Sequence, residues 1–245
     1  MATLIFATYA IAHFSVVVFA LRILRRYAAP GALIIAVLSI GLIYDNGLIA
    51  LGSSIGIGDT LETLSWPRFI LHAVVTPFMI IAVVQVAIAG GIQWLNTRAA
   101  WTGIWVLTAA MVGYGIYELT ILELQPACFG GITRYTSSAS PAQFCFEGQQ
   151  QLPGVGPPIP SILTVFLIMG FGAVLWKRHR WPWFVLGGLQ MLLAASVPFS
   201  QFGLIPGNGG EVILQFAFVA TAYRLSSGWP SKGASRRGDS AQQAA

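Results

Sequence analysis

Long apolar runs alternate with short polar breaks along the chain, and the breaks contain most of the charged residues. Runs of about 17 to 25 residues are long enough to cross about 30 Å of hydrocarbon as α-helices. The pattern therefore predicts an all-α fold, a polytopic integral membrane protein built as a seven-transmembrane-helix bundle. The predicted spans are residues 3–24, 31–52, 66–90, 101–124, 157–176, 182–203 and 210–226.

Composition supports the membrane interpretation. Hydrophobic residues make up 56% of the 245 residues and charged residues only 9%, whereas soluble domains carry about 25% charged residues. The first run lacks a basic segment before it and a small-residue cleavage site after it, so we interpret it as a mature helix and not as a signal peptide. The predicted transmembrane domain covers residues 1–226, and the polar tail 227–245 is predicted to be disordered.

Lysine and arginine predict the orientation. In a seven-span chain, almost all of them fall on one side, which by the positive-inside rule is cytoplasmic. The C-terminus is then cytoplasmic and the N-terminus is outside or lumenal, in a plasma membrane or endomembrane. The net charge of +5 indicates contact with membrane lipids that carry anionic headgroups. The sequence contains no basic stripe with interleaved aromatic residues, so we do not expect it to bind nucleic acid.

The two cysteines, Cys128 and Cys145, both lie in the longest loop, residues 125–156, on the predicted non-cytoplasmic side. Disulfides persist in such oxidising environments, so we expect a Cys128–Cys145 disulfide that closes this outer loop. The alternative is a pair of free thiols.

Asp45 lies inside the second apolar run, with no basic residue near it in sequence. An ionised side chain near the centre of a membrane helix costs at least about 2.5–3.5 kcal/mol unless a partner or a polar cavity compensates. Counting residues from the predicted span ends places His72 of the third span and Glu118 of the fourth at a similar depth. We therefore predict that Asp45, His72 and Glu118 form the catalytic centre of an outward-offset pocket.

Other polar side chains occur at nearly the same depth, so that each span contributes a hydrogen-bonding group to one layer in its outer half. His13, Ser161, Thr164, Ser196, Ser200 and Gln201 belong to this layer. The residues that we expect to line a substrate-binding surface are Tyr44, Asn46, Arg68, Thr76, Tyr114, Tyr117 and Gln215.

The third span also predicts which way its polar residues face. Arg68, His72 and Thr76 are spaced i, i+4 and i+8, which places them on one helix face. We expect Asp59 and Glu62, in the preceding loop, to pair with Arg68, and His72 to meet Asp45 or Glu118. Pro77 removes a backbone hydrogen bond, so we expect a kink near Thr76.

Purely structural interpretations stay open for these residues. Asp45 with Asn46 could clamp two helices together, His72 could be a packing histidine, and Arg68 could extend along the membrane interface. Glu211 stands at the predicted start of the last helix, where the helix dipole favours a negative charge. The stretch Gly207–Gly210 contains turn or packing glycines.

The leading functional hypothesis is an intramembrane enzyme that acts on a lipid-soluble, isoprenoid-like substrate by carboxylate and histidine acid–base catalysis, with cyclisation as one such reaction. Aromatic rings near the pocket would stabilise a cationic intermediate. The alternative is a non-enzymatic protein, a receptor, sensor or accessory subunit, that binds a small apolar ligand or pigment.

Several other classes are disfavoured by the residues present. A retinal Schiff base needs a lysine in the last span, but the two lysines are Lys177 and Lys232, outside the spans. A zinc site from His13, His72, Asp45 and Glu118 lacks diagnostic spacing, and no cofactor is expected. No phosphate-binding loop is present, and no internal repeat suggests a secondary transporter.

Overall fold

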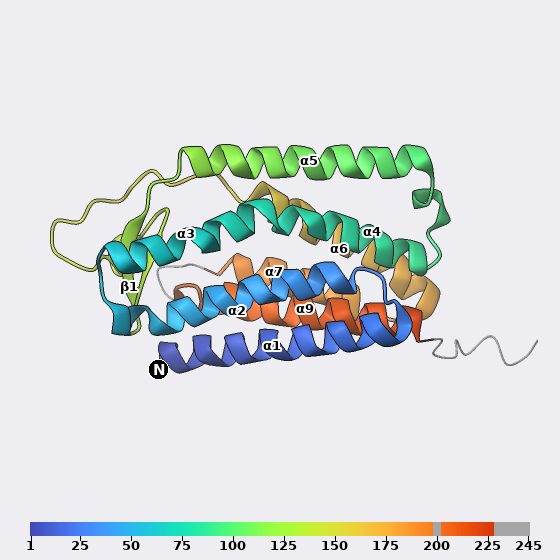
Figure 1. Ribbon diagram of the computed structural model, residues 1–245, viewed down its shortest axis with the longest axis horizontal. Helices are drawn as coiled ribbons and strands as arrows, with labels where there is room; N and C mark the ends of the chain where they lie inside the picture. The colour runs from blue at the N-terminus through green and yellow to red at the C-terminus, as the bar shows by residue number, and fades with distance from the viewer. Residues whose placement is uncertain (198–201, 228–245) are drawn as a thin grey trace, which may run out of the picture.

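The computed structural model describes residues 1–197 and 202–227 and is mostly helical (Figure 1). The α-helices are α1 (Ala2–Tyr27), α2 (Ala32–Ile55), α3 (Asp59–Val74), α4 (Met79–Ala89), α5 (Arg98–Thr120), α6 (Ile159–His179), α7 (Trp183–Ala195) and α9 (Ile205–Ser226). Short 3₁₀ turns are η1 (Thr76–Phe78), η2 (Gln93–Leu95) and η3 (Pro141–Gln143), and the strands are β1 (Gln125–Phe129) and β2 (Ile132–Thr136).

Five helical segments within the described residues are long and apolar enough to cross a membrane, so the chain is membrane-embedded. They are Ala2–Tyr27, Ala32–Ile55, Asp59–Ala89, Arg98–Thr120 and Ile159–His179. The helix in the predicted sixth span, α7, is shorter than expected and has only 13 residues. The end of that predicted span includes positions 198–201, which lie outside the described part. The seventh predicted span is part of α9, which has 22 residues but begins with a polar, glycine-rich stretch.

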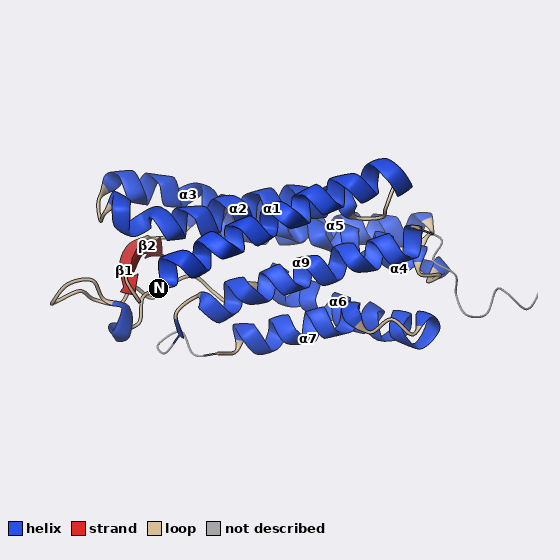
Figure 2. Cartoon of the chain, turned by 90° about the horizontal axis from the view of Figure 1, so that it is seen from below, coloured by secondary structure: helices blue, strands red, loops and turns tan. Residues whose placement is uncertain are grey.

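The helices lie side by side along the long axis of the molecule and alternate in direction (Figures 1 and 2). Helix α1 packs on α2 and α9, α7 packs between α6 and α9, and α5 contacts chiefly α3. The strands and the α2–α3 connection lie at one end, which we call the hairpin end. The α1–α2, α4–α5 and α6–α7 connections lie at the other, which we call the basic end for the charges of Arg22, Arg25, Arg26, Arg98, Lys177, Arg178, Arg180 and Arg224.

The third helical segment breaks where Pro77 predicts a kink. Helix α3 ends at Val74, the 3₁₀ turn η1 follows, and α4 begins at Met79. The start of this segment differs from the prediction, since α3 begins at Asp59 and not near residue 66. Asp59 and Glu62 therefore lie in the first turn of α3, where the helix dipole stabilises them, and not in a connecting loop.

The outer loop contains a β-hairpin that the apolar pattern does not predict. Gly130 and Gly131 both have positive φ, which suits a two-residue hairpin turn whose twist matches that of the strands. The predicted Cys128–Cys145 disulfide is confirmed, with a Cα–Cα distance of 5.1 Å, and it ties β1 to the segment after η3.

Gly52 allows this hairpin to pack directly on α2. A Cβ atom at Gly52 would clash with the carbonyl oxygen of Thr133, so any larger residue would push the strand away. Ser53 adds a hydrogen bond from its hydroxyl to the carbonyl oxygen of Gly131, at 2.7 Å. Gly115 similarly brings α5 against the backbone of Ala73. The hairpin is thus fixed over the end of the bundle that contains Asp45.

Candidate functional site

Asp45 is buried on α2, and its counter-ion is Arg68 on α3. The Arg68 Nε donates to Asp45 Oδ1, and its Nη1 donates to the backbone carbonyl of Tyr135 on β2, at 3.3 Å. The expectation that Asp59 and Glu62 pair with Arg68 is wrong: within the described residues neither acid forms an ion pair. Since Arg68 neutralises Asp45 directly, this pair connects two membrane-crossing helices and the hairpin.

Asn208 of α9 completes the environment of Asp45. Its Nδ2 donates to Asp45 Oδ2 at 3.3 Å and to Asn46 Oδ1 at 3.1 Å, while Asn46 Nδ2 donates to the carbonyl of Leu42 at 2.9 Å. Asn46 is thus part of a clamp between α2 and α9, as one of the structural interpretations proposed. Of the two interpretations of Gly207–Gly210, the turn is wrong, because α9 already begins at Ile205. Packing is supported, because a Cβ atom at Gly210 would lie 2.9 Å from the Cβ atom of Ala194 on α7. A single asparagine among apolar and glycine residues was the available signal.

His72 stands next to Asp45, on the same face of α3 as Arg68 and one turn further along. Its Nε2 lies 3.9 Å from Asp45 Oδ2, which is within ion-pair range but longer than a hydrogen bond. The structure thus brings together the acid of the second predicted span and the imidazole of the third. About 42% of the His72 side-chain surface is accessible, and this surface faces cavities between the helices.

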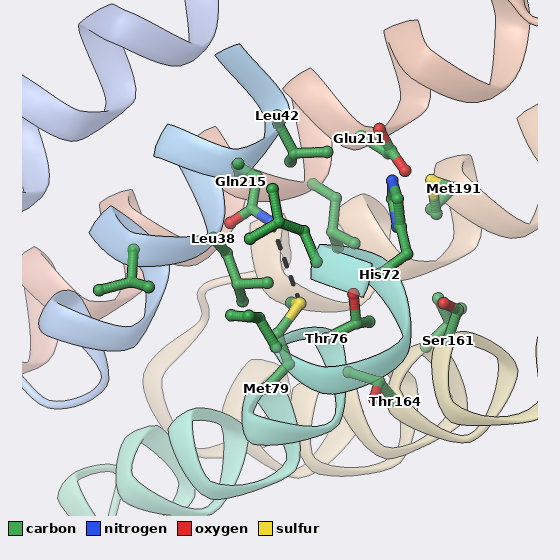
Figure 3. A pocket seen from close by; sticks show the side chains of 16 residues that line it. Leu38, Leu42, His72, Thr76, Met79, Ser161, Thr164, Met191, Glu211 and Gln215 are labelled. Carbon is green, nitrogen blue, oxygen red and sulfur yellow. Dashed lines mark hydrogen bonds between the residues drawn. The ribbon is translucent and has the colours of Figure 1, made fainter. Parts of the chain in front are cut away.

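Glu211 approaches His72 from α9. Figure 3 shows the Glu211 carboxylate and the His72 ring pointing toward one another across the pocket. Asn208 and Glu211 are three residues apart, so they share one face of α9. Glu211 was predicted to interact with the helix dipole at the helix start, but it lies in the second turn of α9. One of its carboxylate oxygens is buried and has no hydrogen-bond partner among the described residues. Sequence reasoning had missed it because the helix start was placed too late.

Two cavities meet at His72. The first has a volume of about 70 Å³ and lies between α2, α3, α6, α7 and α9; its polar lining comprises His72, Thr76, Ser161, Thr164, Glu211 and Gln215. The second has a volume of about 180 Å³ and lies between α3, α5, α6 and the outer loop. His72 and Ser161 line both. One water needs about 10–15 Å³ of such space, so the first cavity holds a few waters or a narrow section of an apolar chain.

Glu118 does not join Asp45. It lines the second cavity, on the α5 side of His72, with one carboxylate oxygen buried and without a hydrogen-bond partner in the described part of the chain. Tyr114 reaches the same wall, where its hydroxyl oxygen would lie 3.1 Å from a Cβ atom at Gly156. Glu118 and Asp45 are thus on different sides of the imidazole, and the predicted set of three is divided between two environments.

The other predicted lining residues also separate into two groups. Thr76 and Gln215 line the first cavity, where Gln215 Nε2 lies 3.9 Å from Met79 Sδ. Tyr117, by contrast, is 59% exposed on α5 and lines neither of the two cavities. The Tyr44 hydroxyl donates to the carbonyl of Leu64 at 2.7 Å, which makes it a link between α2 and α3.

The predicted polar layer holds for part of the remaining helices. His13 of α1 is fully buried, and neither ring nitrogen has a hydrogen-bond partner among residues 1–197 and 202–227. Ser196 is exposed at the end of α7, and Ser200 and Gln201 lie outside the described residues. The described residues contain no cluster of three or more His, Cys, Asp or Glu side chains that could hold a metal ion.

A scan against protein-family models finds no match, and neither a search of curated proteins nor one of solved structures finds a match. What the site offers is an imidazole accessible from two cavities, one carboxylate fixed beside it by an arginine and an asparagine, and a second carboxylate facing it from another helix.

Proposed function

We propose that the chain is a seven-span membrane protein with the hairpin end outside or in the lumen and the basic end in the cytoplasm. One of the five long apolar segments contains both α3 and α4. Together with α7 and α9, the five segments give seven antiparallel helical spans, which we call rods. Eight Lys and Arg residues gather at the ends of rods that share one side, as the positive-inside rule requires. The disulfide lies at the opposite end, which suits an oxidising compartment.

We further propose that the protein is an intramembrane enzyme that acts on a lipid-soluble substrate by acid–base catalysis. The observation that carries this proposal is the position of His72, which contacts both cavities and lies between Asp45 and the facing Glu211. An imidazole that is oriented by one carboxylate can transfer a proton at a substrate atom held on its other side. The aliphatic walls of the first cavity favour a substrate that enters from the lipid.

The proposed roles follow from the contacts. Asp45 is a positioning residue, because its two oxygens already interact with Arg68, Asn208 and the edge of His72. His72 is the proposed proton carrier. Glu211, with a buried oxygen free of hydrogen bonds to the described residues, is the proposed second acid–base group, and Glu118 serves the second cavity. This assignment moves the proton donor for any isoprenoid cyclisation from Asp45, which is ion-paired, to Glu211.

A non-enzymatic binding protein is the second candidate, and one observation favours it. The first cavity is narrow and mostly aliphatic, with Leu38, Leu42 and Val75 among its walls, which fits retention of an apolar ligand or pigment as well as it fits turnover. The two candidates differ in what His72 does. An enzyme needs the imidazole for product formation, whereas a binding protein needs it, at most, for affinity.

Mass spectrometry of apolar molecules that copurify with the protein separates the candidates. Wild type is compared with His72→Gln, which keeps a polar side chain of similar size, and with His179→Gln, a control at the basic end. We expect a substrate and its product with the wild type and the control, and only the substrate with His72→Gln. An identical bound molecule in all three preparations would establish the binding protein, and an unchanged product in His72→Gln would overturn the catalytic role.

A further inference from the structure

A second arginine is buried at the hairpin end, on β2, and it has no hydrogen-bond or ion-pair partner among the described residues. Arg134 is only 6% exposed, yet its guanidinium makes no hydrogen bond or ion pair with any described residue. A buried guanidinium normally has partners for its five N–H groups, because an unpaired buried charge is strongly destabilising. Arg134 is thus a buried charge without a paired group among the described residues.

The hairpin register explains why Arg134 points into the bundle. Side chains alternate between the two faces of a strand, so Arg134 shares a face with Ile132. Ile132 packs in a buried cluster with Phe6 of α1 and Ile49 of α2. The disulfide and the close approach at Gly52 fix this strand over the bundle. The guanidinium is therefore directed toward the bundle by the fold and is not a surface side chain that folded back.

Arg134 also lies beside the Asp45–Arg68 pair. Arg68 donates to the carbonyl of Tyr135, the residue that follows Arg134. The pKa of Arg134 is lowered to about 9, first because burial disfavours its charge and second because Arg68 is close, while Asp45 raises it. The guanidinium thus stays charged at neutral pH. Since Asp45 balances only Arg68, the group of three residues carries one uncompensated positive charge.

We propose that Arg134 and the free edge of Arg68 form a binding site for an oxyanion, a phosphate or a carboxylate, at the hairpin end. The planar guanidinium matches two oxygens of such a group at once. Arg68 uses Nε and Nη1 for protein acceptors, and its Nη2 makes no hydrogen bond with the described residues. An anion here would restore charge neutrality to the three buried ionised groups.

This position also suggests what the anion belongs to. Arg68 is one helical turn from His72 on α3, and His72 opens to both cavities. The acidic group of an amphiphile held by the two arginines would leave its apolar chain close to the imidazole. This identification of the ligand as the acidic end of the substrate rests on the proposed function, whereas the oxyanion site itself requires no catalysis.

The site can be tested by binding measurements on the full chain in nanodiscs of neutral phosphatidylcholine. Three probes separate the sources of the anion: dodecyl phosphate, inorganic phosphate, and dodecanol as a chain-matched compound without charge. We expect dodecyl phosphate to bind the wild type and raise its thermal midpoint, and dodecanol to do neither. If inorganic phosphate binds by itself, the site takes a free anion. If dodecyl phosphate binds and inorganic phosphate does not, the site is a headgroup site.

Two substitutions test the residues. Arg134→Gln is expected to weaken the binding of dodecyl phosphate by about 10- to 100-fold, the loss typical of charge-assisted hydrogen bonds. Arg134→Lys is expected to weaken this binding less. Without ligand, Arg134→Gln should unfold at the same temperature as wild type or higher, because it removes an unpaired buried charge. Arg22→Gln, an exposed arginine at the basic end, should bind like wild type.

Two outcomes would overturn the inference: neither anionic probe binds the wild type, or Arg134→Gln binds as tightly as wild type does. Because the readout is binding and not turnover, it is independent of the experiment on His72. A chain that forms product but ignores both anions would refute only the oxyanion site. A chain that binds dodecyl phosphate through Arg134 but forms no product would refute only the proposed catalysis.

Discussion

The half of the bundle toward the basic end and the half toward the hairpin end differ in the side chains that fill their interior. In the basic half, the interior is a continuous aliphatic and aromatic cluster that includes Ile23, Ile35, Val83, Phe184 and Phe218. In the hairpin half, the same rods surround ionised and amide side chains that are joined by hydrogen bonds. Buried polar groups in a membrane are costly and mark function by default, so the difference supports the proposal that the chemistry lies in the hairpin half.

The largest expected effect comes from breaking the central ion pair. Asp45→Ala leaves Arg68 buried without a counter-ion, and we expect a loss of about 3–5 kcal/mol in the free energy of unfolding. Replacing both residues with apolar side chains, as Asp45→Leu with Arg68→Met, should recover most of this loss. Reversible unfolding in mixed detergent micelles, followed by circular dichroism, measures it. Arg22→Ala in the basic half is the control, and a loss below about 1 kcal/mol for Asp45→Ala would contradict the comparison.

The next effect concerns the cover of the hairpin half. Replacing Cys128 and Cys145 together by serine opens a loop with a sequence separation of 17, for which the chain-entropy estimate is about 3 kcal/mol. Hydrogen exchange followed by mass spectrometry should show faster exchange in β1 and β2 and unchanged exchange in α4. Faster exchange of α4 as well would mean that the two halves unfold together and are not independent.

A smaller effect is expected where α9 meets α2. Asn208→Ala removes two hydrogen bonds, to Asp45 and Asn46, and should cost about 1 kcal/mol. The same unfolding measurement applies, with the exposed Asn96→Ala at the basic end as the matched substitution. Equal stability of the two variants would show that Asn208 contributes nothing to the clamp.

The smallest effect is predicted for a polar contact of the basic half. Gln85 accepts a hydrogen bond from the backbone N–H of Gly31 at 2.8 Å, near the α1–α2 connection. Gln85→Ala should cost about 0.5 kcal/mol, because water can reach this end and replace the bond. The imidazole NMR signals of His72 should not shift. A shift would mean that changes in the basic half are transmitted to the site.

Much of the architecture could be predicted from the sequence, because apolar length and proline act locally. The first two long helices, the break before Met79 and the cysteine pair follow from such signals. The encounter of Asp45 with His72 was also predictable, since residue counting along antiparallel rods gives depth, and the spacing of Arg68, His72 and Thr76 gives a face. The hairpin was not, because a short strand pair within a polar loop has no strong apolar period.

The site was predicted less completely, for a physical reason. Depth does not determine the direction in which a side chain points, and Tyr117, which residue counting places at the depth of the pocket, is largely exposed. Asn208 and Glu211 were missed because glycine and proline near residue 207 indicate a turn, whereas packing on α1, α2 and α7 keeps that stretch helical. The pairing of Asp45 with Arg68 needs the register of two helices, which only the tertiary structure supplies.

The wall that the two cavities share has a consequence for access to His72. Among the residues that the structure describes, His72 and Ser161 are the two that border both spaces, so on the proposed function the imidazole can reach a molecule held in either one. A bulky residue at position 161 would take space from both cavities beside His72, each of which has one carboxylate of its own.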